Sequence, residues 1–575
     1  MTQAGHSMSK KNKRLILSIF ASFLLVATII AISMGINSRK NSTENDAAHA
    51  LLMTSCNSTR YPDLCYSAAT SFPEAAEKIN SGHPQAAILN NINATIDAIN
   101  SKKIKAEKIL NTKKTKKRQR NALKDCLQNY KSSLADLDNV WGKIQSNPDN
   151  PRLQEREYAE SLTTQVSSCQ TNQDSCIDGF SHSLFSRIFR KLFFPPKEKN
   201  VGMMCSKALT SIKKLIEDNK ASTVNGLKST SRKLKDESDG DEGWPEWLSV
   251  TDRRLFQSSL LTPDVVVAAD GSGKYRTVSA AVAAAPKHSS KRYIIKIKAG
   301  IYRENVEVPS EKTNVVFLGD GRKKTIITAS RNAVDGGTTY HSATVAVLGQ
   351  GFLARDITFQ NTAGASKYQA VALRVESDLA AFYKCGMLAH QNTLHVHSKR
   401  QFFISCYIAG TVDFIFGNSA AVFQDCDIHA RRPNPGQTIT ITAQGRSDPN
   451  QNTGIVIQKS RIGATSDLQL VRSNFSAYLG RPWKEYSRTV IMQSSISDVI
   501  SPAGWHEWKG TFALNTLYFA EYENSGAGAG TSGRVPWKGY KVITDATEAQ
   551  AFTARNFITG SSWLKSTTFP FSLGL

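Results

Sequence analysis

The chain has few acidic residues for its size. Its 575 residues include 48 Asp and Glu but 72 Lys and Arg, which gives a formal net charge of +24. Such an excess indicates a polyanionic partner, such as nucleic acid, an acidic membrane surface or an acidic polysaccharide. The stretch 257–575 carries roughly +12 of this charge, so a basic tail is excluded as its only source. A charge spread in this way suits a long anionic polymer.

Long apolar runs are also scarce. Residues 15–36 form one that contains no charged side chain and can just cross a hydrocarbon core. Several Lys and Arg residues lie immediately before it, so we expect residues 1–14 to be cytoplasmic and the remainder to be exported. The segment then acts as a signal anchor, with a single-pass precursor, or as a signal peptide. The alternative, a buried core helix, is disfavoured by the length and the flank.

Cysteines and glycosylation acceptors agree with export. The chain has nine cysteines, an odd number that leaves at least one thiol unpaired or intermolecular. The Asn-x-Ser/Thr acceptors are Asn41, Asn57, Asn93 and Asn474.

Residues 51–219 have few β-branched runs and show heptad-like apolar spacing, which predicts a helical bundle. Cys56 and Cys65 are close enough in sequence to close a helical hairpin, and Cys126 and Cys176 are placed to join two bundle helices. No partner is assigned to Cys169 or Cys205.

Residues 220–261 lose this periodicity and have the composition of a linker. The pair Arg253-Arg254 is a dibasic site of the kind that processing proteases cut, and ordinary solvated charge is the alternative.

Long amphipathic helices are absent from 262–575, where short β-branched segments alternate with Gly, Asn and Asp. This pattern leaves a sandwich, a barrel or a β-solenoid. The motif Phe-x-x-Cys recurs at Cys385, Cys406 and Cys426, with separations of 21 and 20 residues. A repeat of this length predicts the stacked coils of a parallel β-helix. Stacking would also let Cys385 and Cys406 form a disulfide, while Cys426 is left without an assignment.

Polar residues follow a similar spacing. Gln369, Gln391 and Asp413 are each separated by 22 residues, so we expect them to lie one above another. Stacked amides beside a carboxylate can stabilise a developing negative charge, but they are also common as structural ladders in solenoids.

Asp413 lies in an otherwise apolar run, GTVDFIFGN, where an ionised group is costly unless it is paired. Arg481 and Trp483 are two positions apart and would face the same side of a strand. The guanidinium can orient the carboxylate, and the indole can stack on a sugar ring. A purely structural ion pair is the alternative.

Several longer motifs resemble the plant pectin methylesterases over nearly all of 262–575. They are DGSGKYRTV (270–278), KYQAVALRV (367–375), GTVDFIFGN (410–418), YLGRPWKEYSRTV (478–490) and the C-terminal WLKSTTFPFSLGL. The helical region resembles the pectinesterase-inhibitor domain, with its cysteine pairs ahead of Asp178-Gly179-Phe180. The resemblance implies a right-handed parallel β-helix that removes methyl esters from pectin without metal or cofactor.

Residue by residue, the resemblance implies that Asp413 is the nucleophile and that Gln391 and Gln369 stabilise the oxyanion. Arg481 would orient Asp413, while Thr339 and Trp483 would contact the substrate. It also implies an inhibitory pro-domain that precedes a processing site at Arg253-Arg254.

One position departs from the family pattern. Where the family has Gln-Asp-Thr-Leu-Tyr, with the Asp as general acid, this chain has Gln391-Asn392-Thr393-Leu394-His395. An amide cannot deliver a proton to the departing methoxide. Three hypotheses follow: Asn392 leaves a slow esterase, the imidazole of His395 takes over the proton transfer, or the domain binds pectin without turning it over.

Other functions have less support. A metal site formed by His390, His395 and His397 is the less favoured alternative, because alternating residues on a strand face different neighbours. A pectate lyase or polygalacturonase would need clustered Asp residues or paired acids that the sequence lacks. We therefore expect a monomer secreted to the cell wall, with pectin, its own pro-domain and a processing protease as partners. No nucleic-acid partner is expected.

Overall fold

The computed structural model describes residues 84–111, 115–145, 156–180, 201–226 and 262–575. The described part of the chain before residue 262 is helical, as the sequence predicts. Its long helices are α4 (Pro84–Leu110), α5 (Lys117–Gln145), α6 (Arg156–Asp178) and α8 (Val201–Gly226).

Disulfides join these helices. Cys126–Cys176 links α5 to α6, which is the pairing expected from the sequence. Cys169–Cys205 links α6 to α8 and gives partners to two cysteines for which the sequence predicted none. The expected Cys56–Cys65 bridge lies outside the described residues.

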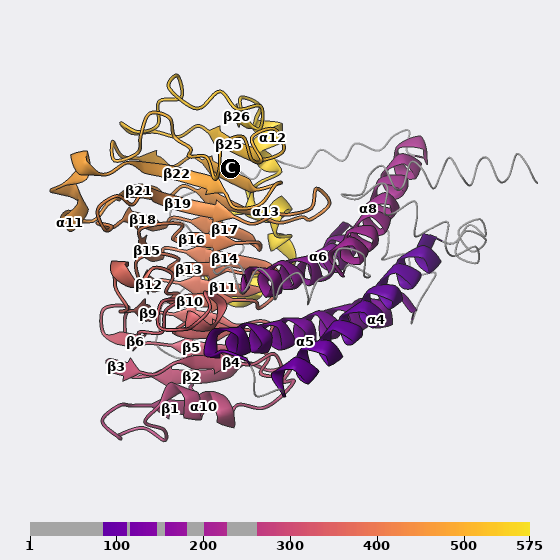
Figure 1. Ribbon diagram of the computed structural model, residues 1–575, viewed down its shortest axis with the longest axis horizontal. Helices are drawn as coiled ribbons and strands as arrows, with labels where there is room; N and C mark the ends of the chain where they lie inside the picture. The colour runs from indigo at the N-terminus through magenta and orange to yellow at the C-terminus, as the bar shows by residue number, and fades with distance from the viewer. Residues whose placement is uncertain (1–83, 112–114, 146–155, 181–200, 227–261) are drawn as a thin grey trace, which may run out of the picture. The chain divides into compact units, whose positions relative to one another are not determined.

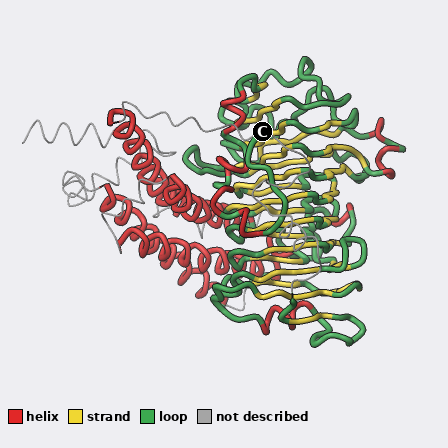
Figure 2. Tube along the Cα trace, turned by 180° about the vertical axis from the view of Figure 1, so that it is seen from behind, coloured by secondary structure: helices red, strands yellow, loops and turns green. Residues whose placement is uncertain are grey.

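From Val265 onward the chain forms three parallel sheets, A, B and C, and most coils contribute one strand to each (Figures 1 and 2). This confirms the predicted parallel β-helix. Sheet A contains β1 (Val265–Val267), β2 (Tyr293–Ile297), β5 (Val315–Leu318), β8 (Leu353–Arg355), β11 (Ala380–Tyr383), β14 (Arg400–Ile404), β17 (Ala420–Gln424), β20 (Gly454–Gln458), β23 (Arg488–Met492), β25 (Tyr518–Tyr522) and β26 (Tyr540–Val542). Sheet B contains β3 (Gly300–Arg303), β6 (Thr325–Ala329), β9 (Thr358–Asn361), β12 (Gly386–Leu388), β15 (Tyr407–Gly410), β18 (Asp427–Ala430), β21 (Arg461–Ala464) and β24 (Ser495–Ile496). Sheet C contains β4 (Val306–Val308), β7 (Val345–Val347), β10 (Leu373–Val375), β13 (Leu394–Val396), β16 (Ile415–Gly417), β19 (Ile439–Gln444) and β22 (Ala477–Pro482).

A single left-handed residue makes most of the corners between sheets A and B. These corner residues have φ between 47° and 58° although none is glycine: Asp356, Lys384, Ser405, Asp425, Lys459, Gln493 and Glu523. Non-glycine residues rarely adopt this conformation. The corner is therefore repeated from coil to coil by the stacking itself rather than by a glycine in each coil.

Behind these corners, phenylalanine rings stack inside the coil. The ring centroids of Phe382 and Phe403 are 4.8 Å apart, and those of Phe403 and Phe423 are 4.6 Å apart, with nearly parallel planes. Strands of neighbouring coils pair these residues in register, which explains the Phe-x-x-Cys repeat.

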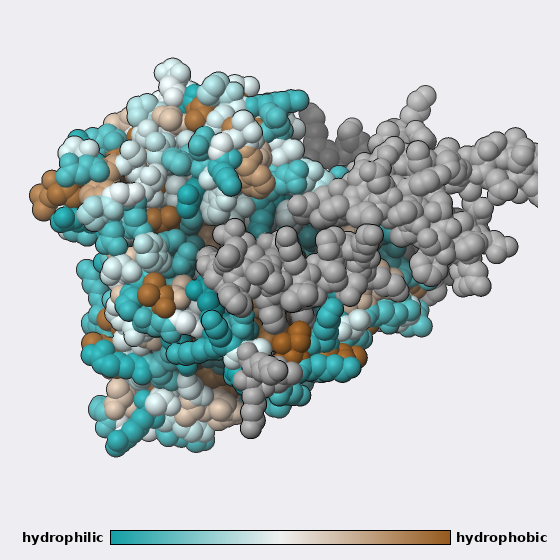
Figure 3. Space-filling model, viewed as in Figure 1, coloured by the Kyte–Doolittle hydropathy of each residue, from teal (hydrophilic) through white to brown (hydrophobic). Residues whose placement is uncertain are grey.

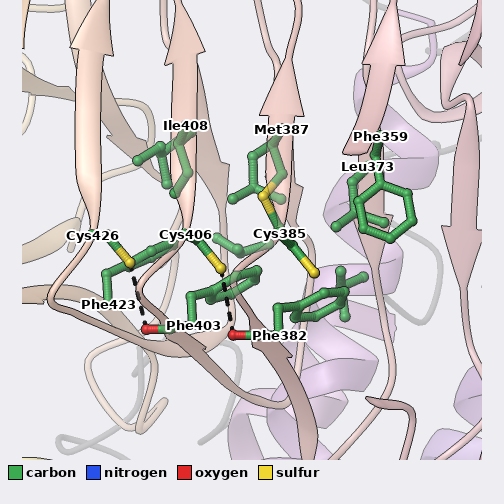
Figure 4. Close-up of a cluster of buried hydrophobic side chains, with 14 of the residues drawn as sticks. Phe359, Leu373, Phe382, Cys385, Met387, Phe403, Cys406, Ile408, Phe423 and Cys426 are labelled. Carbon is green, nitrogen blue, oxygen red and sulfur yellow. Dashed lines mark hydrogen bonds between the residues drawn. The ribbon is translucent and has the colours of Figure 1, made fainter. Parts of the chain in front are cut away.

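The predicted Cys385–Cys406 disulfide is wrong. Cys385, Cys406 and Cys426 are buried free thiols. Figure 4 shows their sulfurs side by side and pointing the same way. Each thiol donates to a backbone carbonyl, that of Tyr383, Phe382 or Phe403 in turn.

Short helices cover the ends and one side of the β-helix. Near its N-terminal end, α10 (Val278–Ala284) buries Val278, Ala281 and Val282 in the core. The C-terminal helices pack apolar side chains against the outer face of sheet A. They are α12 (Ala546–Gln550), α13 (Ala554–Phe557) and α14 (Leu564–Thr567), and the remaining short helices are η2 (Tyr340–Ser342), η3 (Ala365–Lys367), α11 (Ser466–Gln469), η4 (Arg472–Asn474) and η5 (Gly560–Ser562).

The helical part and the β-helix have separate cores. One buried apolar cluster contains only residues of the helices and the turn after α6. The clusters inside and outside the coils contain only residues from Val265 onward. Because a part with a complete core of its own can fold alone, residues 258–575 are suited to separate expression.

The stacked rings make a prediction about stability. Phe403→Ala in residues 258–575 should lower the free energy of unfolding by about 3–5 kcal/mol, because it removes the middle ring of a fully buried stack. Chemical denaturation measures this change. The matched control is Phe512→Ala, whose side chain is 40% exposed and should cost less than about 0.5 kcal/mol. Equal effects of the two substitutions would contradict the role of the stack.

The surface is mostly polar. Figure 3 shows hydrophilic residues over much of the described face in view, with apolar residues in small separate patches. Among the described residues, no helix combines the length and apolar character that a membrane span requires. The segment 15–36 lies outside the described residues.

Candidate active site

A pocket of about 320 Å³ brings together the residues that the sequence singled out. Its lining includes Thr339, Gln369, Gln391, Asn392, Asp413, Arg481 and Trp483. They come from the loops that lead into sheet C, from its last strand, β22, and from the residue that follows β22. Segments far apart in the sequence meet here because successive coils place their B-to-C loops next to one another.

Asp413 is the most strongly fixed group in the pocket. Arg481 binds it in a bidentate manner, with Nε 2.7 Å from Oδ1 and Nη2 2.7 Å from Oδ2. The hydroxyl of Thr440 donates to Oδ1 at 2.7 Å and accepts the backbone N–H of Asp413 at 2.9 Å. With 5% of its surface exposed, Asp413 is a buried carboxylate whose charge has a matched partner.

Asn392 and Asp413 occupy equivalent turns on neighbouring coils. Their φ angles are 63° and 50°, in the left-handed region that Asn and Asp tolerate best among residues with a side chain. The Asn392 side-chain amide donates to the backbone carbonyl of Asp413 at 3.3 Å. Position 392 is thus next to Asp413.

The expected stacking of Gln369, Gln391 and Asp413 is off by one position. Leu373, Leu394 and Ile415 pair in register, so one coil at this level is 21 residues long and not 22. Asp413 is therefore in register with Asn392, and Gln391 lies one residue before Asn392. The glutamines still line the pocket because loop side chains are not confined to strict strand register.

His395 lies on the floor of the pocket. It pairs in register with Phe416, which pairs with Ala443 and then with Arg481, so these side chains share one face of sheet C. The His395 ring stacks on Phe416 with centroids 4.2 Å apart, and its buried Nδ1 has no hydrogen-bond partner. Burial, reinforced by His397 and Arg374, holds the pKa of His395 well below its usual range. Its imidazole is therefore neutral near pH 7.

The two other histidines are placed differently. His397 is completely buried, and its Nε2 lies 2.8 Å from the hydroxyl of Ser175 on α6. Burial lowers the pKa of His397 to about 4 and that of His390 to about 4. Among the described residues, no group of three His, Cys, Asp or Glu side chains is arranged to hold a metal ion.

The end of α6 contributes to the same pocket. Ser175, Asp178 and Gly179 are part of its lining, and Asp178 forms an ion pair with Lys484. Other hydrogen bonds join the helices to the β-helix, including Lys399 to Asp136 at 2.8 Å. Asp125 on α5 also accepts a hydrogen bond from Thr338, and burial raises the pKa of Asp125 to about 7.

Sequence reasoning missed several of these residues. Thr440 follows Asp413 by 27 residues because the loop 431–438 lengthens this coil, so a search at a period of about 21 passes over it. The alternating TITITAQ around it was the available signal. Tyr340, Phe416 and Trp508 also line the pocket, but they follow no spacing that singles them out.

A parallel β-helix with a buried, guanidinium-bound carboxylate and side-chain amides in one pocket defines the catalytic part of a carboxylic ester hydrolase. The comparison with known families gives the particular group. The chain belongs to the Pectinesterase family, whose model matches residues 264–561. Residues 50–210 match a second model, Plant invertase/pectin methylesterase inhibitor.

Known relatives span both parts. Pectinesterase 1 of Citrus sinensis is 58% identical over 571 residues, which covers 99% of this chain and 96% of the relative. Pectinesterase/pectinesterase inhibitor U1 of Solanum lycopersicum is 55% identical over 576 residues, 98% of this chain and 97% of the relative. The solved pectin methylesterase from carrot is 73% identical with a TM-score of 0.55, and covers 55% of this chain and 100% of its own.

Proposed function

We propose that the β-helix hydrolyses methyl esters of homogalacturonan in pectin, with Asp413 as the nucleophile. The bidentate pair with Arg481 is the observation that carries this proposal, because it places a guanidinium against both oxygens of a buried carboxyl group and orients them. Membership of the Pectinesterase family and the basic character of the chain support pectin as the substrate class. No metal or cofactor takes part.

The reaction divides into two steps. An oxygen of Asp413 attacks the ester carbonyl carbon, the bond to the methoxy group breaks, and methanol leaves after gaining a proton. Water then hydrolyses the mixed anhydride, which returns the Asp413 carboxylate and a galacturonate carboxylate and releases two protons, one of which replaces the proton that the methoxide gained. Oδ2 is the attacking atom, because Oδ1 accepts hydrogen bonds from both Arg481 and Thr440.

The amides of Gln391 and Gln369 donate to the oxyanion that develops on the carbonyl oxygen. Thr339 and Trp483 contact the sugar, and Trp483 supplies an aromatic face to it. These residues all line the pocket that contains Asp413.

The proton transfer is the weak part of this site. Asn392 donates a hydrogen bond but cannot release a proton, and a neutral His395 is a base rather than an acid. Because its pKa is held well below the usual range, His395 resists protonation and does not supply the proton that methoxide needs. We infer a slow esterase. The second candidate is a pectin-binding protein without turnover. The observation that favours it is Asn392, which stands where a general acid is expected.

We further propose that the helical part is an intramolecular inhibitor. The end of α6 shares the pocket with Asp413, and the interface is made of polar contacts that can separate without exposing a core. Cleavage at Arg253-Arg254, which lies outside the described residues, releases the β-helix in the cell wall as a monomer. Export through the segment 15–36, and glycans on Asn57, Asn93 and Asn474, belong to the same proposal. The described acceptors Asn93 and Asn474 are both exposed.

Autoinhibition predicts that cleavage raises activity. A full-length chain with Arg253→Ala and Arg254→Ala should release methanol from pectin at least about tenfold more slowly than residues 258–575. Methanol release at equal molar concentration measures this ratio. Equal rates would contradict the inhibitory role of the helices, provided that intact protein is recovered at the end of the assay.

A further inference from the structure

The start of α5 and the end of α4 carry a strong positive charge. Residues 101–111 and 115–124 contain nine Lys and Arg but a single acidic residue, Glu107. The basic residues are Lys102, Lys103, Lys105, Lys108, Lys116, Lys117, Arg118, Arg120 and Lys124. Neither the reaction at Asp413 nor the contact of α6 with the pocket makes use of this charge.

Three of these side chains form a stripe along one face of α5. Lys117, Arg120 and Lys124 are separated by three and four residues, so they lie on neighbouring turns of the same face. The buried residues of α5, among them Cys126 and Ser133, occupy the opposite face. Lys117 and Lys124 are exposed, and Arg120 is half-buried. We call these three residues the α5 stripe.

The charge of the α5 stripe is not neutralised by the protein. Among the described residues, Arg120 and Lys124 form no ion pair. Lys117 Nζ lies 3.4 Å from the backbone carbonyl oxygen of Asp335, which is a neutral acceptor. Asp125 is the acidic residue nearest to the stripe in the sequence, but its buried carboxyl group is bound by Thr338.

The position of the stripe is unfavourable for the helix itself. Like charges three or four residues apart on a helix repel one another, and cations at a helix N-terminus oppose the helix dipole. The first turn of α5 contains no acidic side chain to offset either effect. An anion bound along the stripe would relieve both, because it pairs with the cations and faces the positive end of the dipole.

We propose that the α5 stripe binds de-esterified galacturonan, a linear polymer with a carboxylate on each unit, in the uncleaved chain. The stripe extends for about 10 Å along the helix, so it is suited to several carboxylates of an extended polymer rather than to one small anion. The pocket that contains Asp413 is lined by residues of α6 and of the β-helix, which makes the stripe a separate site. Only the identity of the polymer rests on the proposed function.

A polysaccharide fits the stripe better than a lipid surface does. Helices that bind to a membrane surface insert an apolar face into it. The apolar face of α5, which includes Leu123, Tyr130 and Leu137, is buried in the core of the helical part. The face that remains for a partner is the charged one. The uncleaved chain, with α6 at the pocket, is therefore held on polymer that is already de-esterified, and cleavage removes this attachment together with the helices.

The test uses the full-length chain made uncleavable by Arg253→Ala and Arg254→Ala. The stripe variant adds Lys117→Gln, Arg120→Gln and Lys124→Gln. Binding to an immobilised, fully de-esterified galacturonate oligomer at low ionic strength should be roughly tenfold weaker in the stripe variant, a few-fold for each exposed ion pair lost. Equal binding by the two chains would overturn the proposal.

Two further variants control for total charge and for folding. Lys323→Gln, Lys459→Gln and Lys538→Gln together remove the same charge from exposed positions of the β-helix, and should weaken binding less than about twofold. An equal loss in this variant would overturn the proposal, because total charge and not the stripe would then govern binding. Lys117→Arg with Lys124→Arg keeps the charge and should bind as the unchanged chain does, which separates loss of charge from loss of folding.

Other ligands separate this proposal from the alternatives. A fully methyl-esterified oligomer of the same length has no carboxylates and should not distinguish the stripe variant from the unchanged chain. If the stripe variant loses binding to vesicles of anionic phospholipid but keeps its binding to the oligomer, the stripe is a membrane site and the proposal fails. Weaker oligomer binding by the stripe variant, together with no methanol release from residues 258–575, would leave the stripe standing while the esterase proposal fails.

Discussion

Asn392→Asp is expected to raise kcat on methyl-esterified pectin by roughly a hundred-fold to ten-thousand-fold, the usual contribution of a positioned general acid. The substitution changes little in shape, and Asp accepts the left-handed backbone that Asn392 adopts. The new carboxyl group would lie beside the carbonyl of Asp413 and near its carboxylate. A neighbouring negative charge favours the protonated form of a carboxylic acid, which is the form that can protonate methoxide.

The increase should appear in kcat with little change in KM, because a general acid acts in the transition state. Steady-state kinetics of residues 258–575 measure both constants. Asn392→Ala is the matched control, since it removes the amide without supplying an acid, and it should give no increase. His395→Gln tests the alternative: if Asn392→Asp has no effect and His395→Gln abolishes turnover, then His395 handles the proton and the role given to position 392 is wrong.

Asp413→Asn should lower kcat by at least about ten-thousand-fold, because an amide of the same shape cannot form the acyl-enzyme. The substitution also leaves the Arg481 guanidinium without its charged partner. Burial lowers the pKa of Arg481 while the hydrogen bond and charge of Asp413 raise it, with a net increase. Some loss of stability is therefore expected along with the loss of activity.

Two measurements distinguish these effects. Thermal unfolding reports whether the Asp413→Asn protein is folded at the assay temperature, and binding of de-esterified oligogalacturonide reports whether the pocket is intact. Asp425→Asn, at an exposed corner between sheets A and B, is the control and should retain activity. A folded Asp413→Asn protein that retains more than a few per cent of the rate would exclude Asp413 as the nucleophile.

The fold could be predicted well because the repeat is visible in the sequence as side chains that stack on successive coils. Phe382, Phe403 and Phe423 occupy the same place on successive coils, so their spacing gives the coil length directly. The free thiols could not be predicted, since the choice between a disulfide and a hydrogen bond to a carbonyl depends on side-chain direction and not on spacing.

The sequence predicted which residues form the site better than it predicted how they are arranged. Asp413 was found because an ionised group is costly in an apolar run, and Arg481 and Trp483 because residues two positions apart face the same side of a strand. The register error came from counting between loop residues, whose spacing need not equal the 21-residue strand register. Thr440 was missed because the coil that leads to it advances the strand register by 27 residues, whereas each of the two coils before it advances the register by 21.

The resemblance implied an inhibitory pro-domain, but the residues by which α6 contacts the pocket could not be read from the sequence. Asp178 and Lys484 are 306 residues apart and lie in different domains, so no periodicity relates them. Only the packing of the helices against the β-helix brings the two charges together.

Methanol release from highly methyl-esterified pectin by residues 258–575 tests the central claim most directly. Turnover that continues over many catalytic cycles, and that is lost in a folded Asp413→Asn protein, is the predicted result. The contradictory result is a folded protein that retains pectin but releases no methanol, because this would make the domain a binding protein built on an esterase fold.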